Sequence, residues 1–302
     1  MKKLLFIGGT GFLGKSFFDY LNSSKLKKKE ISEIIILSRR KKKISSNVKI
    51  SFINKNIAYL RSIPVTDYII YAANSKNDKE NIDGVLNFKS LLNEKHKKTK
   101  ILFTSSGAVY GKIKKIKKIK ESDLVSIQNV QKFKGYKRKY AISKIKMERE
   151  FKIISKNGFN VSVARLFSFV GNRILKNKNF AITNLINQAK NKNIKVIKLN
   201  DTKDVYRGYM ESNELIKWLF KILIRSNKDF NIYNVGSDEA ITIENLAKLI
   251  GKKFNKTIYK KKRKNNKDVD YYVPSILKAK KDLNLNINIK IDNSINKLLE
   301  DN

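Results

Sequence analysis

The N-terminal segment changes from a strand-like to a helix-like hydrophobic pattern across a run of glycines. Residues 2–8 (KKLLFIG) are mostly apolar, as in a short buried strand, and from Phe12 to Leu21 apolar side chains recur three to four positions apart. That second spacing predicts an amphipathic helix. The run between them, GGTGFLG at positions 8–14, is therefore predicted to be a glycine turn that joins a strand to a helix.

Strand-like and helix-like segments keep alternating through the first half of the chain. Continuous apolar runs predict strands at 33–37 (EIIIL), 48–53, 67–73, 100–104 and 160–167, and helical spacing predicts helices at 79–92 and 136–154. This alternation is typical of a doubly wound parallel sheet of the Rossmann type. We predict an α/β fold with a dinucleotide-binding domain at 1–167, to which 199–226 returns.

The alternation of strand-like and helix-like segments becomes less regular after about residue 168. Helical spacing predicts helices at 180–190, 213–224 and 243–254, and short apolar runs predict strands at 195–198, 232–235 and 257–260. We predict that residues 168–302 form a smaller C-terminal α/β lobe.

Composition excludes several kinds of chemistry. The chain has no cysteine, so it has no disulfide, no thiolate nucleophile and no cysteine metal site. Its single histidine, His96, lies in the lysine-rich stretch EKHKKTK, where we expect a solvated surface residue. One histidine cannot build a histidine metal cluster, and we expect no bound metal.

Apolar runs in the sequence are all short. None approaches the roughly 20 residues that span a bilayer, and the N-terminus enters a strand without a signal-peptide pattern. We expect a cytoplasmic protein with no membrane partner. The stretch KIKKIKKIK at 112–120 has isoleucine at every third position. It could be an amphipathic membrane helix, but its shortness favours a solvated loop or flap beside the site.

The formal net charge of +41 would attract nucleic acid and other polyanions. The positive residues are mostly lysines scattered along the whole chain among abundant asparagine and isoleucine, a composition that an AT-rich genome favours. We therefore expect no specific nucleic-acid site. We interpret the KKKRK stretch at 260–264 as a solvated charge run rather than a nuclear localisation signal.

The glycine turn is the strongest candidate for chemistry. In a strand–turn–helix context Gly8 permits a tight turn, Gly11 lets the backbone approach a pyrophosphate, and Gly14 lets the helix pack closely. Free N–H groups at the start of the helix would hold the phosphates. The sequence therefore predicts a dinucleotide site that includes Gly8, Thr10, Gly11, Phe12, Leu13 and Gly14.

The ends of the following strands complete the predicted cofactor site. Arg39 and Arg40 follow the second strand, where an acid would grip an adenosine ribose and an arginine would accommodate a 2′-phosphate. We therefore predict NADP as the cofactor, with NAD as the alternative. Residues that follow the third and fourth strands are further predicted contacts: Asn56, Ile57, Ala72 and Ala73.

Tyr140 and Lys144 are spaced four apart, on one face of the predicted helix at 136–154. The pair alone is a weak signal in a lysine-rich chain. It gains weight because it follows the glycine turn and the serines Ser105 and Ser106, which end the fifth strand. Ligands of doubly wound sheets lie beyond these strand ends. A Lys144 ammonium one turn away is predicted to lower the pKa of the Tyr140 hydroxyl.

Together these motifs resemble the extended short-chain dehydrogenases/reductases of the nucleotide-sugar epimerase/dehydratase family. The resemblance runs from residue 2 to about residue 299. Seven segments carry it: GGTGFLG (8–14), TSSGAVYG (104–111), YAISK (140–144), ARLFSFVG (164–171), VYRGYMESNEL (205–215), YNVGSDEAITIENLAKLI (233–250) and YVPSILKAKKDLNL (272–285).

The resemblance implies a catalytic centre in which Ser106 hydrogen-bonds the sugar oxygen, Tyr140 is the acid/base and Lys144 holds the nicotinamide ribose. The lobe at 168–302 would bind a nucleotide sugar. Family members commonly dimerise through a helix bundle, which here would include 136–154, so we expect a homodimer. The implied substrate contacts are Asn179, Phe180 and Asn184 in the pocket and Arg207 on the diphosphate.

Three positions depart from the family's pattern. Asn56 stands where the family usually has an aspartate at the adenine, and Asn172 replaces a proline. Tyr271 stands where many relatives place a second phosphate-binding arginine, a change that bears on diphosphate binding.

The family shares hydride transfer at the sugar's C4 and diverges afterwards. A 4,6-dehydratase has Asp-Glu directly after the serine, but Gly107 and Ala108 occupy those places, which disfavours dehydration. The remaining motifs most resemble the branch that reduces 4-keto-6-deoxy sugars on dTDP or CDP. We predict such a reductase. The alternatives are a nucleotide-sugar 4-epimerase and a non-catalytic dinucleotide-binding protein with an anion-binding surface.

Overall fold

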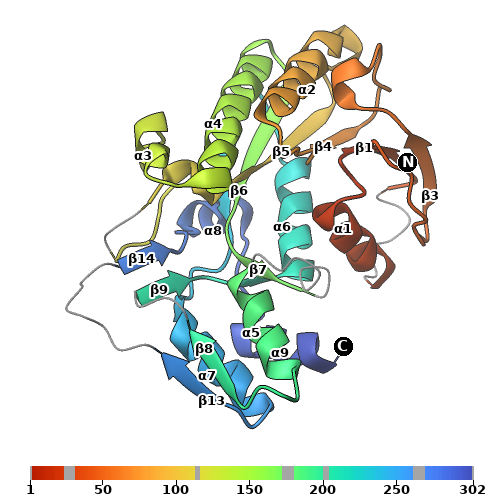
Figure 1. The fold of residues 1–302 in the computed structure, drawn as a ribbon. Helices are drawn as coiled ribbons and strands as arrows, with labels where there is room; N and C mark the ends of the chain where they lie inside the picture. The colour runs from red at the N-terminus through yellow and green to blue at the C-terminus, as the bar shows by residue number, and fades with distance from the viewer. Residues whose placement is uncertain are drawn as a thin grey trace.

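The apolar runs of the chain pair into one parallel sheet, which places both faces of its central strands in the interior. The computed structural model describes residues 2–23, 31–112, 116–171, 180–199, 204–260 and 269–300. The strands run in the order β11-β6-β5-β4-β1-β2-β3 (Figure 1). Their bounds are β1 Lys3–Ile7, β2 Glu33–Leu37, β3 Lys49–Ile53, β4 Tyr68–Tyr71, β5 Lys100–Ser106, β6 Asn160–Leu166 and β11 Asn231–Val235.

Helices cover both faces of this sheet, because side chains alternate along each strand. In β1, Leu4 and Phe6 join the core beneath α1 (Phe12–Ser23), α6 (Ser212–Ile224) and α8 (Leu277–Leu283). Leu5 and Ile7 join the opposite core beneath α2 (Asp78–Leu91) and α4 (Gly135–Lys156). The predicted doubly wound sheet is confirmed, and its strands and helices end within two residues of the predicted limits.

Short elements that the hydrophobic pattern did not predict connect these layers. Each of them follows a polar cap or a strand end rather than a periodic apolar run. They are η1 (Ile57–Tyr59), η2 (Glu94–His96), η3 (Gly107–Tyr110) and α3 (Ile127–Gln131).

The strand β11 lies in the main sheet, although the sequence analysis assigned residues 232–235 to the smaller lobe. Asn231–Val235 pairs in parallel with Ser162–Leu166 of β6. The chain thus returns to the sheet beyond residue 226, and α8 then packs on the same face as α6. A short apolar run predicts a strand but does not determine which sheet the strand joins.

In its described residues, the smaller lobe is built from two strand pairs, one three-stranded sheet and three helices, shown below the sheet in Figure 1. Its core gathers Val170, Ile186, Ile197, Leu246 and Ile295. The strand groups are β7 (Phe169–Val170) with β10 (Met210–Glu211), β8 (Val196–Leu199) with β13 (Thr257–Lys260), and β12 (Ile241–Thr242) with β9 (Asp204–Arg207) and β14 (Val269–Tyr272). The helices are α5 (Ala181–Lys190), α7 (Ile243–Lys253) and α9 (Ile291–Glu300).

His96 is buried, contrary to the expectation of a solvated residue. Only 1% of it is exposed, and its Nδ1 lies 3.0 Å from Oδ1 of Asn93, which caps η2. Burial lowers the pKa of His96, so the ring is held neutral. The lysines that flank it in sequence suggested solvent, but the tight turn directs the imidazole inward.

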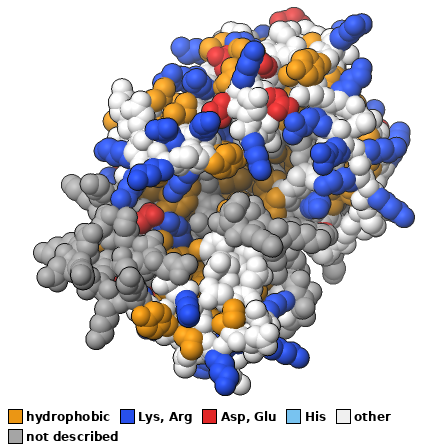
Figure 2. All heavy atoms as spheres, in the orientation of Figure 1, with side chains coloured by type: hydrophobic (Ala, Val, Ile, Leu, Met, Phe, Trp, Pro, Cys, Tyr) orange, Lys and Arg blue, Asp and Glu red, His pale blue; other side chains and the backbone are white. Residues whose placement is uncertain are grey.

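The surface carries lysines and arginines over both lobes, and hydrophobic side chains appear in the hollow between them (Figure 2). Across the described residues, none of the helices combines the length and the apolarity that a membrane crossing requires. In the 112–120 stretch, residues 113–115 lie outside the described residues. Ile119 is fully buried and bridges Pro274, so this end of the stretch is anchored to the smaller lobe.

Candidate active site

The carboxyl ends of β1, β4 and β5 open onto a cavity of about 1290 Å³. That volume exceeds the roughly 300–1,000 Å³ of a typical small-molecule site and leaves room for two ligands. The cavity lies where the strand order reverses between β1 and β4, as expected for a doubly wound sheet. Residues from both lobes line it, among them Ser106 of β5 and Arg207 of β9.

The glycine turn is tightly packed at its two ends and open in the middle. Gly8 has φ +85°, and a Cβ there would lie 2.6 Å from the Ala73 nitrogen. A Cβ on Gly14 would lie 1.8 Å from the Gly9 carbonyl oxygen, so Gly14 packs against the turn itself and does not line the cavity. A Cβ on Gly11 would contact only the Gly8 carbonyl oxygen, at 3.3 Å.

The open side of the turn fits a pyrophosphate. Thr10, Gly11, Phe12 and Leu13 line the cavity at the start of α1, where free backbone N–H groups favour phosphate. Phe12 stacks on Phe169 with ring centroids 4.8 Å apart, which fixes the start of the helix. Of the predicted cofactor residues, Ile57, Ala72 and Ala73 also line the cavity.

Beside the residues predicted to contact the adenosine lies an acid that the sequence analysis missed, Glu80. Glu80 of α2 pairs with Arg39 (Nη1–Oε1 2.6 Å), accepts from Asn56 Nδ2 (2.8 Å) and accepts from the Ser75 hydroxyl. The Ser75 bond, together with Arg39 and Asn56, lowers the pKa of the Glu80 carboxyl. Arg40 lines the cavity with its side chain exposed. Nothing in the sequence linked Glu80 to Arg39, because 41 residues separate them.

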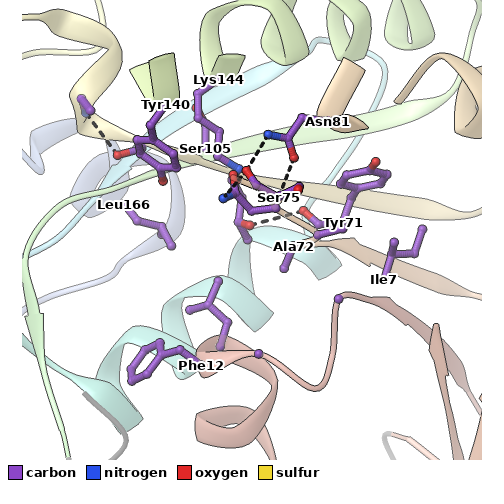
Figure 3. A pocket seen from close by; sticks show the side chains of 18 of the residues that line it. Ile7, Phe12, Tyr71, Ala72, Ser75, Asn81, Ser105, Tyr140, Lys144 and Leu166 are labelled. Carbon is purple, nitrogen blue, oxygen red and sulfur yellow. Dashed lines mark hydrogen bonds between the residues drawn. The ribbon is translucent and has the colours of Figure 1, made fainter. Parts of the chain in front are cut away.

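The predicted catalytic residues lie together between α4 and the end of β5. The Lys144 Nζ donates to the Thr104 carbonyl (3.1 Å) and lies 5.8 Å from the centroid of the Tyr140 ring. The Ser106 hydroxyl accepts from the Ala108 nitrogen at 3.2 Å. Figure 3 shows Tyr140 and Lys144 reaching from α4 into the cavity, across from Phe12.

Electrostatics at Tyr140 differ from the prediction. Burial raises the pKa of the Tyr140 hydroxyl, and its interaction with Ser106 only partly opposes this. Burial lowers the pKa of Lys144 to about 8, against the opposing charge of Glu148. The prediction that Lys144 lowers the pKa of Tyr140 is wrong. The Lys144 ammonium donates to the Thr104 carbonyl, and burial is the largest influence on the pKa of both residues.

Gly107, directly after Ser106, has no room for a side chain. A Cβ there would lie 2.6 Å from the Tyr272 hydroxyl and 2.8 Å from the Phe167 ring. Tyr272 lines the cavity from β14, and burial raises the pKa of its hydroxyl. The sequence motif around Tyr272 gave no sign that its side chain reaches Gly107.

Cations gather where the smaller lobe meets the cavity. Arg207 pairs with Asp270 (Nη2–Oδ2 2.9 Å), and its guanidinium lies over the Tyr272 ring at 5.6 Å. Lys137 of α4 also lines the cavity, a position that the sequence analysis missed. Burial lowers the pKa of Lys137; the charge of Asp270 opposes this shift and the nearby Arg207 adds to it.

The remaining predicted substrate residues, and two of the departures from the family pattern, lie in different places. Phe180 lines the cavity. Asn184 does not: it is exposed on α5, and its Oδ1 accepts from Gln188 at 2.7 Å. Asn179 and Asn172 lie outside the described residues. Tyr271 is buried against Tyr206, with ring centroids 5.3 Å apart, away from the cavity.

The motifs and their arrangement agree with a comparison of whole sequences. The sequence profile of the NAD dependent epimerase/dehydratase family matches residues 4–236. The chain belongs to this family. It is therefore an enzyme of the short-chain dehydrogenase/reductase type, within a family of nucleotide-sugar epimerases, dehydratases and related enzymes. No curated protein matches the chain by sequence.

Solved structures share the fold over nearly the whole chain. UDP-glucose 4-epimerase from Thermotoga maritima, with UDP-glucose, has a TM-score of 0.76 at 18% identity, covering 99% of this chain and 97% of that one. dTDP-glucose 4,6-dehydratase from Bacillus anthracis, with NAD, gives 0.77 at 16% identity, covering 99% and 96%. RMD from Pseudomonas aeruginosa, with NADPH, gives 0.74 at 20% identity, covering 100% and 98%.

Proposed function

We propose that the protein reduces the 4-keto group of a nucleoside-diphosphate 4-keto-6-deoxy sugar with NADPH. The state of Tyr140 carries this proposal. Burial raises the pKa of its hydroxyl, so the phenol keeps its proton at neutral pH. Reduction of a ketone makes an alkoxide that needs a proton donor, and a neutral phenol beside Ser106 supplies one.

Each residue of the centre has a part in that reaction. The bound cofactor would supply the hydride to the sugar's C4. Ser106 would hydrogen-bond the C4 oxygen, and Tyr140 would protonate it as negative charge develops there. Lys144, buried and fixed on the Thr104 carbonyl, would hold the ribose of the cofactor in place.

Gly107 argues against dehydration. The 4,6-dehydratases of this family carry an acid and a base directly after the serine. At position 107 any side chain would collide with Tyr272 and Phe167. The site therefore supports hydride transfer at C4 without an elimination step.

The cations at the lobe boundary support a diphosphate-bearing substrate. Arg207 and Lys137 line the same cavity, and the charge of Arg207 disfavours the charged form of Lys137. A diphosphate bound between the two cations would relieve this repulsion. A guanidinium is suited to phosphate because its donor fork is planar. Lys137 would supply the second cation that Tyr271 does not.

NADPH is proposed over NADH because Arg39 and Arg40 both line the adenosine end of the cavity. Glu80 holds Arg39, so we expect the preference to be modest. A carboxylate in that region can accept from a ribose hydroxyl, as it would in an NAD site. Solved structures of this fold hold NAD or NADPH.

The test is to incubate the protein with UDP-, dTDP- and CDP-linked sugars, including 4-keto-6-deoxy forms, and to follow NADPH absorbance. We expect NADPH oxidation only with the keto sugars, and tighter binding of NADPH than of NADH. Interconversion of 4-hydroxy sugars without keto-sugar reduction would instead identify a 4-epimerase. Binding of dinucleotide with no turnover of any sugar would identify a non-catalytic protein.

A further inference from the structure

Beneath the active site, one face of α4 holds two consecutive residues of β5. Lys144 donates to the Thr104 carbonyl at 3.1 Å, and Glu148, one helical turn further, accepts from the Ser105 hydroxyl at 2.5 Å. The next residue of β5 is Ser106. Figure 3 shows Lys144 and Ser105 next to one another at this junction.

Glu148 is fixed by a buried ion pair. Arg165 of β6 donates from Nη2 to Oε2 (2.7 Å) and from Nε to Oε1 (3.0 Å) of Glu148. The two side chains are 5% and 9% exposed. Such a bidentate pair is rigid, and it tolerates burial only because each oxygen is hydrogen-bonded.

The third nitrogen of Arg165 extends the network past Ser106. Its Nη1 donates to the Tyr110 hydroxyl at 2.8 Å, and that hydroxyl donates to Asn234 Oδ1 at 2.8 Å. Tyr110 belongs to η3, the turn that follows Ser106. The network therefore holds the chain on both sides of the catalytic serine, at Ser105 and at Tyr110.

We propose that Glu148 is a positioning residue that acts through Lys144 and Ser105. Its carboxylate fixes α4 against the end of β5, so that the ammonium and the Ser106 hydroxyl keep their relative places, and its negative charge compensates the buried ammonium. The catalytic part of this role rests on the proposed function. The effect of the Glu148 charge on Lys144 does not depend on which sugar is bound.

The surroundings of Lys144 explain why the charge of Glu148 matters. From β5, the Thr104 carbonyl and the Phe103 ring (5.0 Å) face the ammonium, and from α4, Tyr140 and Glu148 do. Arg165 of β6 donates to both carboxylate oxygens of Glu148. Burial lowers the pKa of Lys144 to about 8 and Glu148 raises it. Without that carboxylate the ammonium would lose its proton within the neutral range.

The test is the pH dependence of NADPH affinity in the Glu148→Gln variant, measured by fluorescence titration, with the pH profile of kcat/KM alongside. Glutamine keeps the shape and an acceptor for Ser105 but removes the charge. NADPH affinity should fall at high pH, where Lys144 loses its proton. In Glu148→Gln we expect this fall to occur about one pH unit lower or more, because an opposite charge beside a buried group has been removed. Glu150→Gln is the matched control, because Glu150 pairs with Lys89 outside the cavity.

If NADPH affinity falls at the same alkaline pH in Glu148→Gln as in the parent protein, the proposal is overturned. The binding readout needs no sugar, so it remains decisive even if the protein reduces none of the sugars tested. If the glutamine variant does not fold, Glu148→Asp keeps the charge but shortens the reach to Ser105, and Ser105→Ala removes that bond alone. We expect both to lose NADPH affinity at the same alkaline pH as the parent protein and to lose about ten- to a hundredfold in kcat. Unchanged turnover in both would equally overturn the proposal.

Discussion

Tyr140 and Lys144 are buried titratable groups, and burial moves their pKa values in opposite directions. Each shift favours the neutral form. For Tyr140 this preserves the proton that reduction consumes. For Lys144 it means that the ammonium is retained at a cost in folding free energy, which is common where function requires a buried charge.

Tyr140→Phe deletes the proton donor but keeps the ring. We expect kcat for keto-sugar reduction to fall by about 10²- to 10⁴-fold, the usual contribution of general acid catalysis. Ser106→Ala should lose one hydrogen bond to the developing oxyanion, roughly 10²-fold. Steady-state kinetics measure both, with circular dichroism and NADPH titration as controls for folding and binding. Near-normal turnover by Tyr140→Phe would exclude the proposed mechanism.

Lys144→Met should abolish activity and stabilise the fold. The folded pKa of about 8 lies below the unfolded value of 10.5, so the ammonium destabilises the folded state below pH 8 and ceases to do so above pH 10.5. The variant should therefore unfold with a free energy higher by on the order of 1–3 kcal/mol at neutral pH. That advantage should shrink as pH rises toward 10.5. Urea titrations at several pH values measure it, and equal stability at neutral pH would contradict the burial argument.

At the scale of elements, the glycine turn separates a packing role from a binding role. Gly14 lies against the Gly9 backbone, whereas Gly11 faces the open cavity. Two alanine variants of one motif can therefore report on different properties.

Gly14→Ala should destabilise the fold by about 3 kcal/mol, since its Cβ overlaps backbone that cannot move freely. Gly11→Ala should change stability by less than about 1 kcal/mol but weaken NADPH binding about tenfold or more, because the methyl group faces the pyrophosphate. Thermal unfolding and NADPH titration distinguish the two. The reverse pattern would show that the dinucleotide does not lie on Gly11.

Regular elements with long apolar runs were predictable, and contacts between distant elements were not. The strand–turn–helix at the N-terminus and the Tyr140–Lys144 helix follow from local periodicity. The pairing of Glu80 with Arg39 depends on how α2 packs against the end of β2, which periodicity does not encode. The placement of Tyr272 against Gly107 likewise depends on how the two lobes close on one another.

Surface patterns in the sequence were less informative than core patterns. The lysines around His96 suggested exposure, but a side-chain cap directs the ring inward. For the short strand β11, its apolar residues predicted burial without identifying its sheet. For β11 the missing information was its distant partner strand β6, whereas for His96 it was the local cap by Asn93, three residues away.

At the scale of the whole molecule, α2 and α4 lie side by side on the outer face of the sheet (Figure 1). Each helix leaves an apolar side chain partly exposed, Leu86 at 40% and Ile153 at 41%. Neither residue lines the cavity. We propose that these helices form the surface of a homodimer, as expected from the family resemblance.

Light scattering should therefore find a dimer for the parent chain and a monomer for the Leu86→Lys/Ile153→Lys variant, since two buried lysines at such an interface would lack partners. NADPH binding should persist in the monomer. Leu124→Lys is the control, because Leu124 is exposed but lies outside both helices. A parent chain that is monomeric, or a variant that remains dimeric, would refute this interface.

Transfer of deuterium from cofactor to sugar tests the central claim most directly. The protein would be incubated with NADPH deuterated at the transferred C4 position and a nucleoside-diphosphate 4-keto-6-deoxy sugar, and the product would be examined by NMR and mass spectrometry. The account predicts one deuterium per product molecule, bound at the sugar's C4, and formation of that product about 10²- to 10⁴-fold more slowly by the Tyr140→Phe variant. Product without deuterium at C4, or unchanged keto sugar with the parent enzyme, would contradict it.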